Sequence, residues 1–304
     1  MKVLISDPLP DDGVKLLKEK GVEVIVKTGM SPEELLQEIK NYEVIVVRSA
    51  TKVRKEVIDA GEKLKLIVRG GVGIDNIDVE YAKTKGITVL NTPGASTISV
   101  AELTIGMMIA VSRKLASATI SMKSGKWEKK IFKGIELYGK TLGLIGSGRI
   151  GTAVAERAKA LGMKVIAYDP YANEELLKEK GIELIKDLDE LLATSDIISL
   201  HIPKTDETIH IINKKTIAKM KDGAILINCA RGGTVDEEAL YEALKSGKLY
   251  GAGIDVYEKE PPEKSPLFEL DNVVLSPHIG ASTKEGQARV SIEAAEKIID
   301  FFNL

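Results

Sequence analysis

The sequence predicts an α/β protein built from two doubly wound parallel sheets, each covered by helices on both faces. Short apolar strands alternate with amphipathic helices over residues 1–95, and the alternation repeats over residues 97–280. Strands that alternate with helices are typical of parallel sheets whose crossovers are helical. A chain of 304 residues is also long enough for two domains with separate cores.

Composition excludes several classes of function. The net charge is −2 and the pI is near 6.1, so we expect no basic surface for nucleic acid or for an anionic membrane. No signal peptide is expected, and the most apolar helical stretch, 100–111, contains Glu102 and is about half the length of a membrane span. The single cysteine, Cys229, excludes an internal disulfide and indicates a reducing cytoplasm. The three histidines are far apart, so no metal site is expected.

The first segment shows strands but no nucleotide motif. Strand candidates occupy residues 3–6, 22–26, 44–48, 66–69 and 88–90. Ser31 and Glu34 form a predicted capping box with Pro32 in the first turn of a helix. Because this segment lacks a glycine fingerprint, we do not expect it to hold a nucleotide.

A glycine-rich turn follows the predicted strand at 141–145. Gly146, Gly148 and Gly151 match the G-x-G-x-x-G pattern, in which glycines allow a tight turn, a close approach of pyrophosphate and contact between helix and strand. Asp169 ends the next strand about 20 residues later, as a ribose-binding carboxylate does. The pattern predicts a site for NAD rather than NADP; the alternative is a glycine turn and a strand-end acid without a ligand.

The second segment has six predicted strands, which begin near 141, 164, 196, 224, 251 and 273. A helical segment, 97–124, opened by a Ser99–Glu102 capping box, leads into it. A terminal helix carries an apolar stripe at Ala288, Ile292, Ala295, Ile299 and Phe302 that could return to the first domain. We therefore expect a nucleotide domain, 97–280, inserted into a substrate domain, 1–96 and 281–304, with a cleft between them.

Oxidation of an alcohol by a dinucleotide needs a proton acceptor, and few residues qualify. His278 follows the last predicted strand, where α/β sites gather; the alternative is a loop histidine bonded to backbone. His201 also ends a strand, but we expect it on the adenine side of the cofactor. His210 is expected in a loop.

Other polar residues follow strands of the second segment. Arg231 could hold a substrate carboxylate through two hydrogen bonds, or could be a structural arginine paired with an acid. Glu260 could orient a protonated imidazole, with Glu258 as a competitor and a solvated loop acid as the alternative. Cys229 is interpreted as a small buried residue near the nucleotide.

Two arginines end strands of the first segment. Arg48 and Arg69 stand beside loops whose N–H groups can bind an anion, so they suggest a substrate with more than one negative group. Trp127 is expected to pack at an interface rather than to bind substrate.

Seven motifs in order resemble the D-isomer-specific 2-hydroxy-acid dehydrogenases over nearly the whole chain, most closely the branch that oxidises D-3-phosphoglycerate. They are Val-Arg-Ser-Ala-Thr (47–51), Gly-Val-Gly-Ile-Asp-Asn (71–76), Gly-Lys-Trp-Glu (125–128), Gly-Ser-Gly-Arg-Ile-Gly (146–151), Asn-Cys-Ala-Arg-Gly-Gly (228–233), Asp-Val-Tyr-Glu-Lys-Glu-Pro-Pro (255–262) and Ser-Pro-His-Ile-Gly-Ala-Ser-Thr (276–283). The resemblance implies a Rossmann NAD domain inserted into a flavodoxin-like substrate domain, in a short form without a C-terminal regulatory domain.

The resemblance also implies roles for individual residues. Arg231, Glu260 and His278 match the catalytic trio. Positions that contact NAD in the family are matched by Val72, Gly146, Gly148, Arg149, Ile150, Gly151, Asp169, Ile202, Cys229, Ala230, Asp255 and Gly280. Substrate-side positions are matched by Arg48, Ser49, Arg69 and Gly71. Ser96 stands where the family commonly has an asparagine that contacts substrate, so that contact is not expected to be the same here.

The implied reaction is NAD-dependent oxidation of D-3-phosphoglycerate to 3-phosphohydroxypyruvate, with His278 as acid and base. A glyoxylate or hydroxypyruvate reductase, or another D-2-hydroxy-acid dehydrogenase, would share every catalytic residue. An NAD-sensing scaffold like the C-terminal-binding corepressors is a further alternative. The region 100–130 resembles the dimer contact of the family, so a cytoplasmic homodimer is expected.

Overall fold

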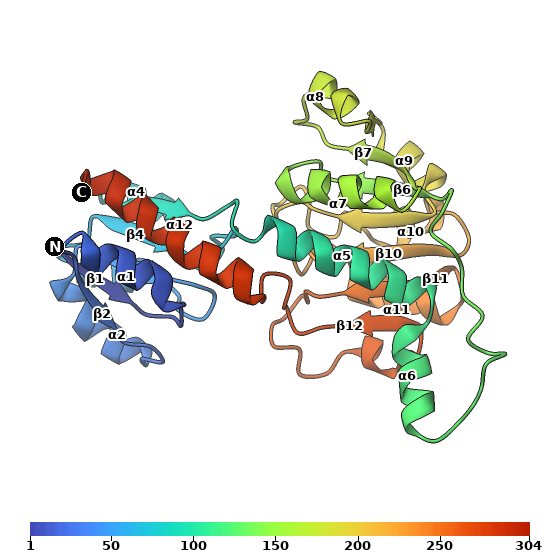
Figure 1. The fold of residues 1–304 in the computed structure, drawn as a ribbon, viewed down its shortest axis with the longest axis horizontal. Coiled ribbons are helices and arrows are strands. Elements are labelled where there is room, and N and C mark those ends of the chain that lie inside the picture. Colours follow the sequence, from blue (N-terminus) through green and yellow to red (C-terminus); the bar gives the residue numbers. More distant parts are fainter. The chain divides into compact units, whose positions relative to one another are not determined.

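The computed structural model describes residues 1–304 and divides them into two compact units. Unit 1 comprises Met1–Thr97 and Ala281–Leu304, and unit 2 comprises Ile98–Gly280 (Figure 1). Both sheets are entirely parallel and have helices on both faces, so the predicted fold class is confirmed.

The sheet of unit 1 has five strands in the order β2-β1-β3-β4-β5. The strands are β1 (Lys2–Ile5), β2 (Glu23–Val26), β3 (Val44–Val47), β4 (Leu66–Arg69) and β5 (Thr88–Asn91). The helices are α1 (Asp11–Glu19), α2 (Pro32–Glu38), η1 (Ile39–Asn41), α3 (Lys55–Ala60), α4 (Val79–Thr84) and α12 (Lys284–Phe302). Helices α1 and α12 share a core on one face of the sheet, and α2, α3 and α4 share a core on the other.

The return of the chain to unit 1 depends on close packing between α1 and α12. A Cβ on Gly13 of α1 would lie 2.1 Å from the carbonyl oxygen of Ser291 in α12, so only glycine permits this approach. The Gly13 N–H donates to Ser291 Oγ at 3.1 Å. The predicted stripe is confirmed in part: Ala295 is buried and Ile299 and Phe302 pack against the core, whereas Ile292 is exposed and Val290, Ala294 and Ile298 are buried as well.

The sheet of unit 2 has seven strands in the order β12-β11-β10-β9-β6-β7-β8. The strands are β6 (Thr141–Ile145), β7 (Lys164–Tyr168), β8 (Glu183–Leu184), β9 (Ile197–Leu200), β10 (Ala224–Asn228), β11 (Leu249–Ile254) and β12 (Val273–Leu275). The helices are α5 (Thr97–Ser112), α6 (Leu115–Lys123), α7 (Arg149–Ala160), α8 (Glu174–Glu179), α9 (Leu188–Thr194), α10 (Lys214–Lys219), α11 (Glu237–Lys245) and η2 (Pro266–Glu269). Helices α5 and α7 cover one face, and α9, α10 and α11 cover the other (Figure 1). The order reverses between β6 and β9, and α/β proteins bind ligands at such a switch point.

Three features of unit 2 differ from the prediction. The segment 97–124 is not one helix, because Lys114 adopts a left-handed φ of 53° and separates α5 from α6. The Ser99–Glu102 capping box is wrong as well, since α5 already begins at Thr97 and Ser99 is buried inside the helix. The strand β8 was not predicted, because a strand of two residues is too short to show a hydrophobic period.

Candidate active site

The turn between β6 and α7 has the shape that a pyrophosphate needs. Gly146 has φ of 94°, and a Cβ there would lie 2.5 Å from the His201 carbonyl oxygen. A Cβ on Gly151 would lie 2.4 Å from the Gly146 carbonyl oxygen, whereas nothing lies within 4 Å of the position a Cβ would take on Gly148. Gly148 caps α7 without any side-chain hydrogen bond. The turn therefore leaves open space at the positive end of a helix, where anions bind.

The carboxylate of Asp169, directly after β7, is fixed by three hydrogen bonds. Its Oδ2 accepts hydrogen bonds from the N–H and the hydroxyl of Ser147 at 2.8 and 2.9 Å, and its Oδ1 accepts from the Tyr171 N–H at 3.0 Å. Oδ1, which accepts only one of these bonds, has further acceptor capacity for a ribose hydroxyl. Together the open glycine turn and the fixed carboxylate fit NAD.

The other predicted cofactor residues of unit 2 lie at the same edge of the sheet. Arg149 and Ile150 begin α7, Ile202 lies just after β9, and Cys229 and Ala230 come directly after β10. Burial raises the pKa of Cys229 to about 12, so its thiol stays neutral near neutral pH, 3.5 Å from Met107 Sδ. Val72 belongs to unit 1, where its carbonyl oxygen accepts a hydrogen bond from Asn91 at 2.6 Å.

His278 and Glu260 form the pair that acid–base chemistry requires. His278 Nδ1 lies 2.7 Å from Glu260 Oε2, and the Tyr257 N–H donates to Glu260 Oε1 at 3.0 Å. Burial opposes ionisation of Glu260, but the bonds from His278 and Tyr257 and the positive charges of His278 and Arg231 outweigh it and hold the pKa below its usual value. Because an ionised carboxylate only accepts hydrogen bonds, the proton of a neutral imidazole sits on Nδ1. In that neutral form, Nε2 of His278 carries no proton and can accept one.

The loop that carries His278 is fixed by Asp255, which directly follows β11. His278 has a left-handed φ of 53°, a conformation that costs a residue with a side chain about 1–2 kcal/mol. Asp255 Oδ1 accepts from the Ser276 hydroxyl at 2.5 Å and the Ile279 N–H at 2.8 Å, and Oδ2 accepts from the Gly280 N–H at 2.8 Å. Asp255 was expected beside the cofactor; the structure adds an anchoring role, which no local sequence pattern could reveal because its partners lie 21–25 residues away.

Arg231 lies in the loop between β10 and α11, which packs on the segment that carries Glu260. Its carbonyl oxygen accepts from Asn228 Nδ2 at 3.1 Å and from the Thr234 hydroxyl at 2.7 Å. A Cβ on Gly232 would lie 1.7 Å from the Tyr257 carbonyl oxygen, so the two backbones are in direct contact. Unit 2 therefore brings together all three residues of the predicted trio. Sequence reasoning missed Gly232, whose need to be glycine is set by a neighbour 25 residues later.

The other two histidines, His201 and His210, contact other residues. His201 Nε2 lies 3.0 Å from Ser199 Oγ, and burial lowers the pKa of His201 to about 3, so its imidazole is neutral. His210 Nε2 lies 3.1 Å from Glu258 Oε1. Glu258, which the sequence could not separate from Glu260, is therefore paired with a different histidine.

The predicted substrate residues lie at one edge of the unit 1 sheet. Arg48 follows β3 and Arg69 ends the neighbouring β4, in register with Val47. Gly71 has φ of 144°, and a Cβ there would lie 1.4 Å from Arg69 Nη1. Two arginines, one directly after β3 and one at the end of β4, therefore lie at the same edge of the sheet, which we call the cationic edge.

The loop that contains Arg48 and Ser49 is held on both sides. Asp7 accepts from the Arg48 N–H at 2.5 Å and from the Thr51 hydroxyl at 2.7 Å, while Asn76 Nδ2 donates to the carbonyl oxygens of Arg48 and Thr51, each at 2.7 Å. Ser96, the departure from the family pattern, is buried.

Neither metal ligands nor a single membrane-spanning helix were found. No group of three or more His, Cys, Asp or Glu is placed to hold a metal ion. No single helix is long and apolar enough to cross a membrane; α5 and α6 together pass that test by length and composition alone, as a pair bent by 65°.

Comparison with known proteins agrees with this geometry. Residues 105–280 match the family described as D-isomer specific 2-hydroxyacid dehydrogenase, NAD binding domain. Two relatives are each 56% identical over 98% of this chain. One is a D-3-phosphoglycerate dehydrogenase of Methanocaldococcus jannaschii, of which the chain covers 57%, and the other a hydroxypyruvate reductase of Thermotoga maritima, of which it covers 97%. The chain thus spans little more than half the length of several curated relatives that it matches.

A solved structure shows the same fold with ligands. The D-lactate dehydrogenase of Aquifex aeolicus, complexed with NAD and lactic acid, is 36% identical, aligns with 100% of this chain and 96% of its own, and has a TM-score of 0.87. Family, sequence identity and site geometry lead to one conclusion. The chain belongs to the D-isomer specific 2-hydroxyacid dehydrogenases and binds NAD.

Proposed function

We propose that the protein oxidises D-3-phosphoglycerate with NAD to 3-phosphohydroxypyruvate, the first step of phosphorylated serine biosynthesis. The observation that carries this proposal is the 2.7 Å bond between Glu260 and His278, in the unit that also holds the glycine turn. A base backed by a carboxylate beside a dinucleotide site is what oxidation of a secondary alcohol requires.

His278 Nε2 takes the proton of the substrate hydroxyl, and the carbon that bears it becomes a carbonyl. NAD supplies the acceptor for the hydride that leaves the same carbon. Glu260 stabilises the imidazolium that forms, since its ionised carboxylate already accepts from Nδ1. Arg231 binds the substrate carboxylate through its planar fork.

The phosphorylated substrate is supported by the cationic edge of unit 1 and by the names of several relatives. Arg48 and Arg69 would bind the phosphate, because guanidinium groups match phosphate oxygens in pairs. The relatives from Methanocaldococcus jannaschii and Archaeoglobus fulgidus, at 56% and 54% identity, are both named D-3-phosphoglycerate dehydrogenase.

Hydroxypyruvate reductase is the second candidate. The Thermotoga maritima relative with that name is 56% identical, and the chain covers 97% of it, so identity alone does not separate the two. A dinucleotide-sensing scaffold would keep the fold but would not turn over a substrate.

A substrate panel separates these candidates. We would measure NAD reduction with D-3-phosphoglycerate, D-glycerate, D-lactate and 2-hydroxyglutarate, and NADH oxidation with hydroxypyruvate and its 3-phosphate. The proposal predicts the highest kcat/KM for the phosphorylated pair. A preference for hydroxypyruvate would favour the reductase, and no turnover of any acid would favour the scaffold.

The His278→Ala variant tests the assignment of the base. We expect kcat to fall about 100-fold to 10,000-fold, the range that a general base contributes. NADH should still bind, because His278 is not part of the glycine turn. Retained turnover would contradict the assignment.

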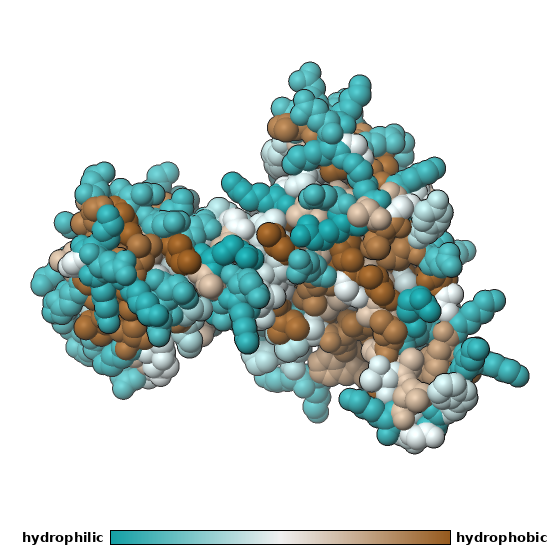
Figure 2. Space-filling model, in the orientation of Figure 1, coloured by the Kyte–Doolittle hydropathy of each residue, from teal (hydrophilic) through white to brown (hydrophobic).

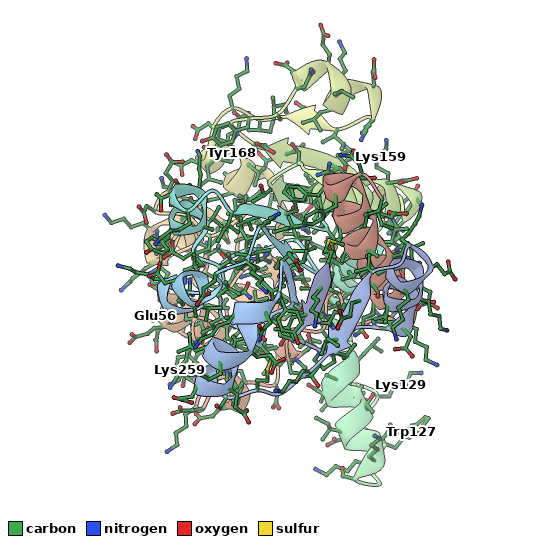
Figure 3. The ribbon with its side chains drawn as sticks, turned by 90° about the vertical axis from the view of Figure 1, so that its left-hand side faces the viewer. Glu56, Trp127, Lys129, Lys159, Tyr168 and Lys259 are labelled. Carbon is green, nitrogen blue, oxygen red and sulfur yellow. The ribbon has the colours of Figure 1, made fainter.

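We also propose a homodimer through residues 100–130. Apolar side chains of α5 and α6 are exposed, among them Ile109, Ile120 and Met122, and Figure 2 shows hydrophobic surface over α5. Trp127 is 80% exposed beyond α6 and points away from it (Figure 3). Sedimentation should give twice the chain mass of 32.9 kDa, and Trp127→Lys should shift the protein towards the monomer.

A further inference from the structure

Two carboxylates beside the Glu260–His278 pair have no part in the chemistry above. Glu237 is the first residue of α11, and Glu258 lies two residues before Glu260. Glu237 Oε1 accepts the N–H of Glu258 at 2.6 Å, and Glu258 Oε1 accepts the N–H of Glu237 at 3.1 Å. These two reciprocal bonds join the start of α11 to the segment that carries Glu260.

The reciprocal bonds determine how that segment is oriented. Consecutive N–H groups at 257 and 258 both donate to carboxylates, Tyr257 to Glu260 at 3.0 Å and Glu258 to Glu237 at 2.6 Å. Lys259, between the two glutamates, is exposed and pairs with Glu263 at 2.7 Å; it lies at the surface in Figure 3. The backbone of the segment is thus held by Glu237, while the partly exposed side chains of Glu258 and Glu260 bond to His210 and His278.

Glu237 holds this position against an electrostatic cost. Burial raises its pKa, and the negative charges of Glu258 and Glu260 raise it further. The Glu258 N–H and the Ser265 hydroxyl, 3.5 Å from Oε2, oppose that shift. The hydrogen bond from the Glu258 N–H therefore offsets part of the cost of placing this half-buried carboxylate beside two others.

We propose that Glu237 is a positioning residue for the proton acceptor: by holding the Glu258 N–H it aligns Glu260 Oε2 with His278 Nδ1. This inference rests on the proposed function, in which Glu260 orients His278. Without the Glu237 acceptor, the Tyr257–Glu260 segment can rotate, and the 2.7 Å bond to His278 weakens. A displacement of about 1 Å at a catalytic group can cost about 100-fold in rate.

A positioning role and a purely electrostatic role have opposite effects on Glu260. The negative charge of Glu237 makes Glu260 harder to ionise, so its loss alone would lower the titration midpoint of Glu260. Misalignment removes the bond from His278 and raises that midpoint. The two roles can therefore be separated by the direction of one measured shift.

Three substitutions at Glu237 distinguish the positioning role from the electrostatic role. Glu237→Asp keeps the charge but withdraws the acceptor by one methylene group, Glu237→Gln keeps the acceptor without the charge, and Glu237→Ala removes both. Glu238→Ala is the matched control, because Glu238 is the next residue of α11 and is exposed. The titration of the Glu260 carboxyl is followed by carbon-13 NMR without substrate, and kcat and KM are measured for D-3-phosphoglycerate and for the best acid of the panel.

We expect the Asp and Ala variants to lose about tenfold or more in kcat with KM nearly unchanged, since no substrate contact is altered. The Asp variant should raise the Glu260 midpoint, and the Gln variant and the control should keep kcat within about twofold of wild type. If the Ala variant does not fold, the kcat and the Glu260 midpoint of the Asp variant test the proposal.

The positioning role is overturned if the Gln variant loses as much kcat as the Asp variant, or if the Asp variant leaves the Glu260 midpoint unchanged. A wild-type protein that turns over no 2-hydroxy acid would refute the proposed function instead. The NMR titration would still test the positioning of Glu260 in that case.

Discussion

A methyl group at Gly232 should separate Arg231 from the acid–base pair. In Gly232→Ala the new Cβ would lie 1.7 Å from the Tyr257 carbonyl oxygen and 2.3 Å from the Tyr257 carbonyl carbon, both backbone atoms that cannot rotate away. Cβ contacts below 3.0 Å are essentially absent from proteins, so one of the two loops must move by at least 3.0 − 1.7 = 1.3 Å. We expect about 1–3 kcal/mol of destabilisation and about a 100-fold loss of kcat.

Steady-state kinetics and thermal unfolding measure both effects. Gly106→Ala in α5 is the matched control, because nothing in the chain lies within 4 Å of its new Cβ; we expect it to stabilise the helix by about 0.5–1 kcal/mol. Because Gly106 lies in the region proposed for the homodimer, its sedimentation is compared with that of wild type. NADH affinity should fall less than kcat in Gly232→Ala, since the β6–α7 turn and Asp169 are not in the contact, although Cys229 and Ala230 lie in the same segment as Gly232. If kcat of Gly232→Ala equals that of wild type, the packing of the Arg231 loop on Tyr257 does not control the site.

Three further changes test other parts of the structure. The pKa of His201 is about 3 in the folded protein, below its ordinary value of 6.5, so at pH 5 the unfolded chain binds a proton that the folded chain excludes. The free energy of unfolding should therefore fall by about 2 kcal/mol between neutral pH and pH 5. Urea titrations of His201→Gln should show a smaller fall. Asp169→Ala should raise the Kd of NADH about tenfold or more, because a charged acceptor for the ribose is lost, and should reduce the preference for NADH over NADPH. The two affinities are measured by fluorescence titration, and an unchanged ratio between them would refute this role of Asp169. Asn76→Ala removes two 2.7 Å bonds to the Arg48 loop and should raise KM for D-3-phosphoglycerate about tenfold; an equal rise for D-lactate would show that Arg48 does not act on the phosphate.

Local features were predictable because the physics behind them acts within a few residues. The capping box of Ser31 and Glu34 forms as expected, with the serine hydroxyl accepting from the Glu34 N–H at 3.2 Å and the Glu34 carboxylate accepting from the Ser31 N–H at 2.8 Å. The N-cap of α11 is also a contact of short range, because the Asp236 carboxylate accepts from the Ala239 N–H at 3.0 Å. The five strands of unit 1 and the glycine turn of unit 2 follow from patterns of similar range.

Local patterns failed where packing decides. The Ser99–Glu102 pair matches a capping box, but α5 starts two residues earlier and buries Ser99. The terminal helix exposes Ile292 and buries Ser291, because Gly13 and Ser291 bring α1 and α12 together on that side. Hydrophobic periodicity predicts the terminal helix, but packing against α1 determines which face of α12 is buried.

The sequence by itself established two doubly wound sheets, a nucleotide turn at Gly146 and a short set of polar residues at strand ends, since alternation, glycine spacing and position after a strand can all be read along the chain. Only the tertiary structure decided which of those residues meet. Glu258 and Glu260 are alike in sequence, yet one bonds to His210 and the other to His278. The difference arises because Asp255 and Glu237 accept hydrogen bonds from backbone N–H groups more than 20 residues away and so hold the two loops in place.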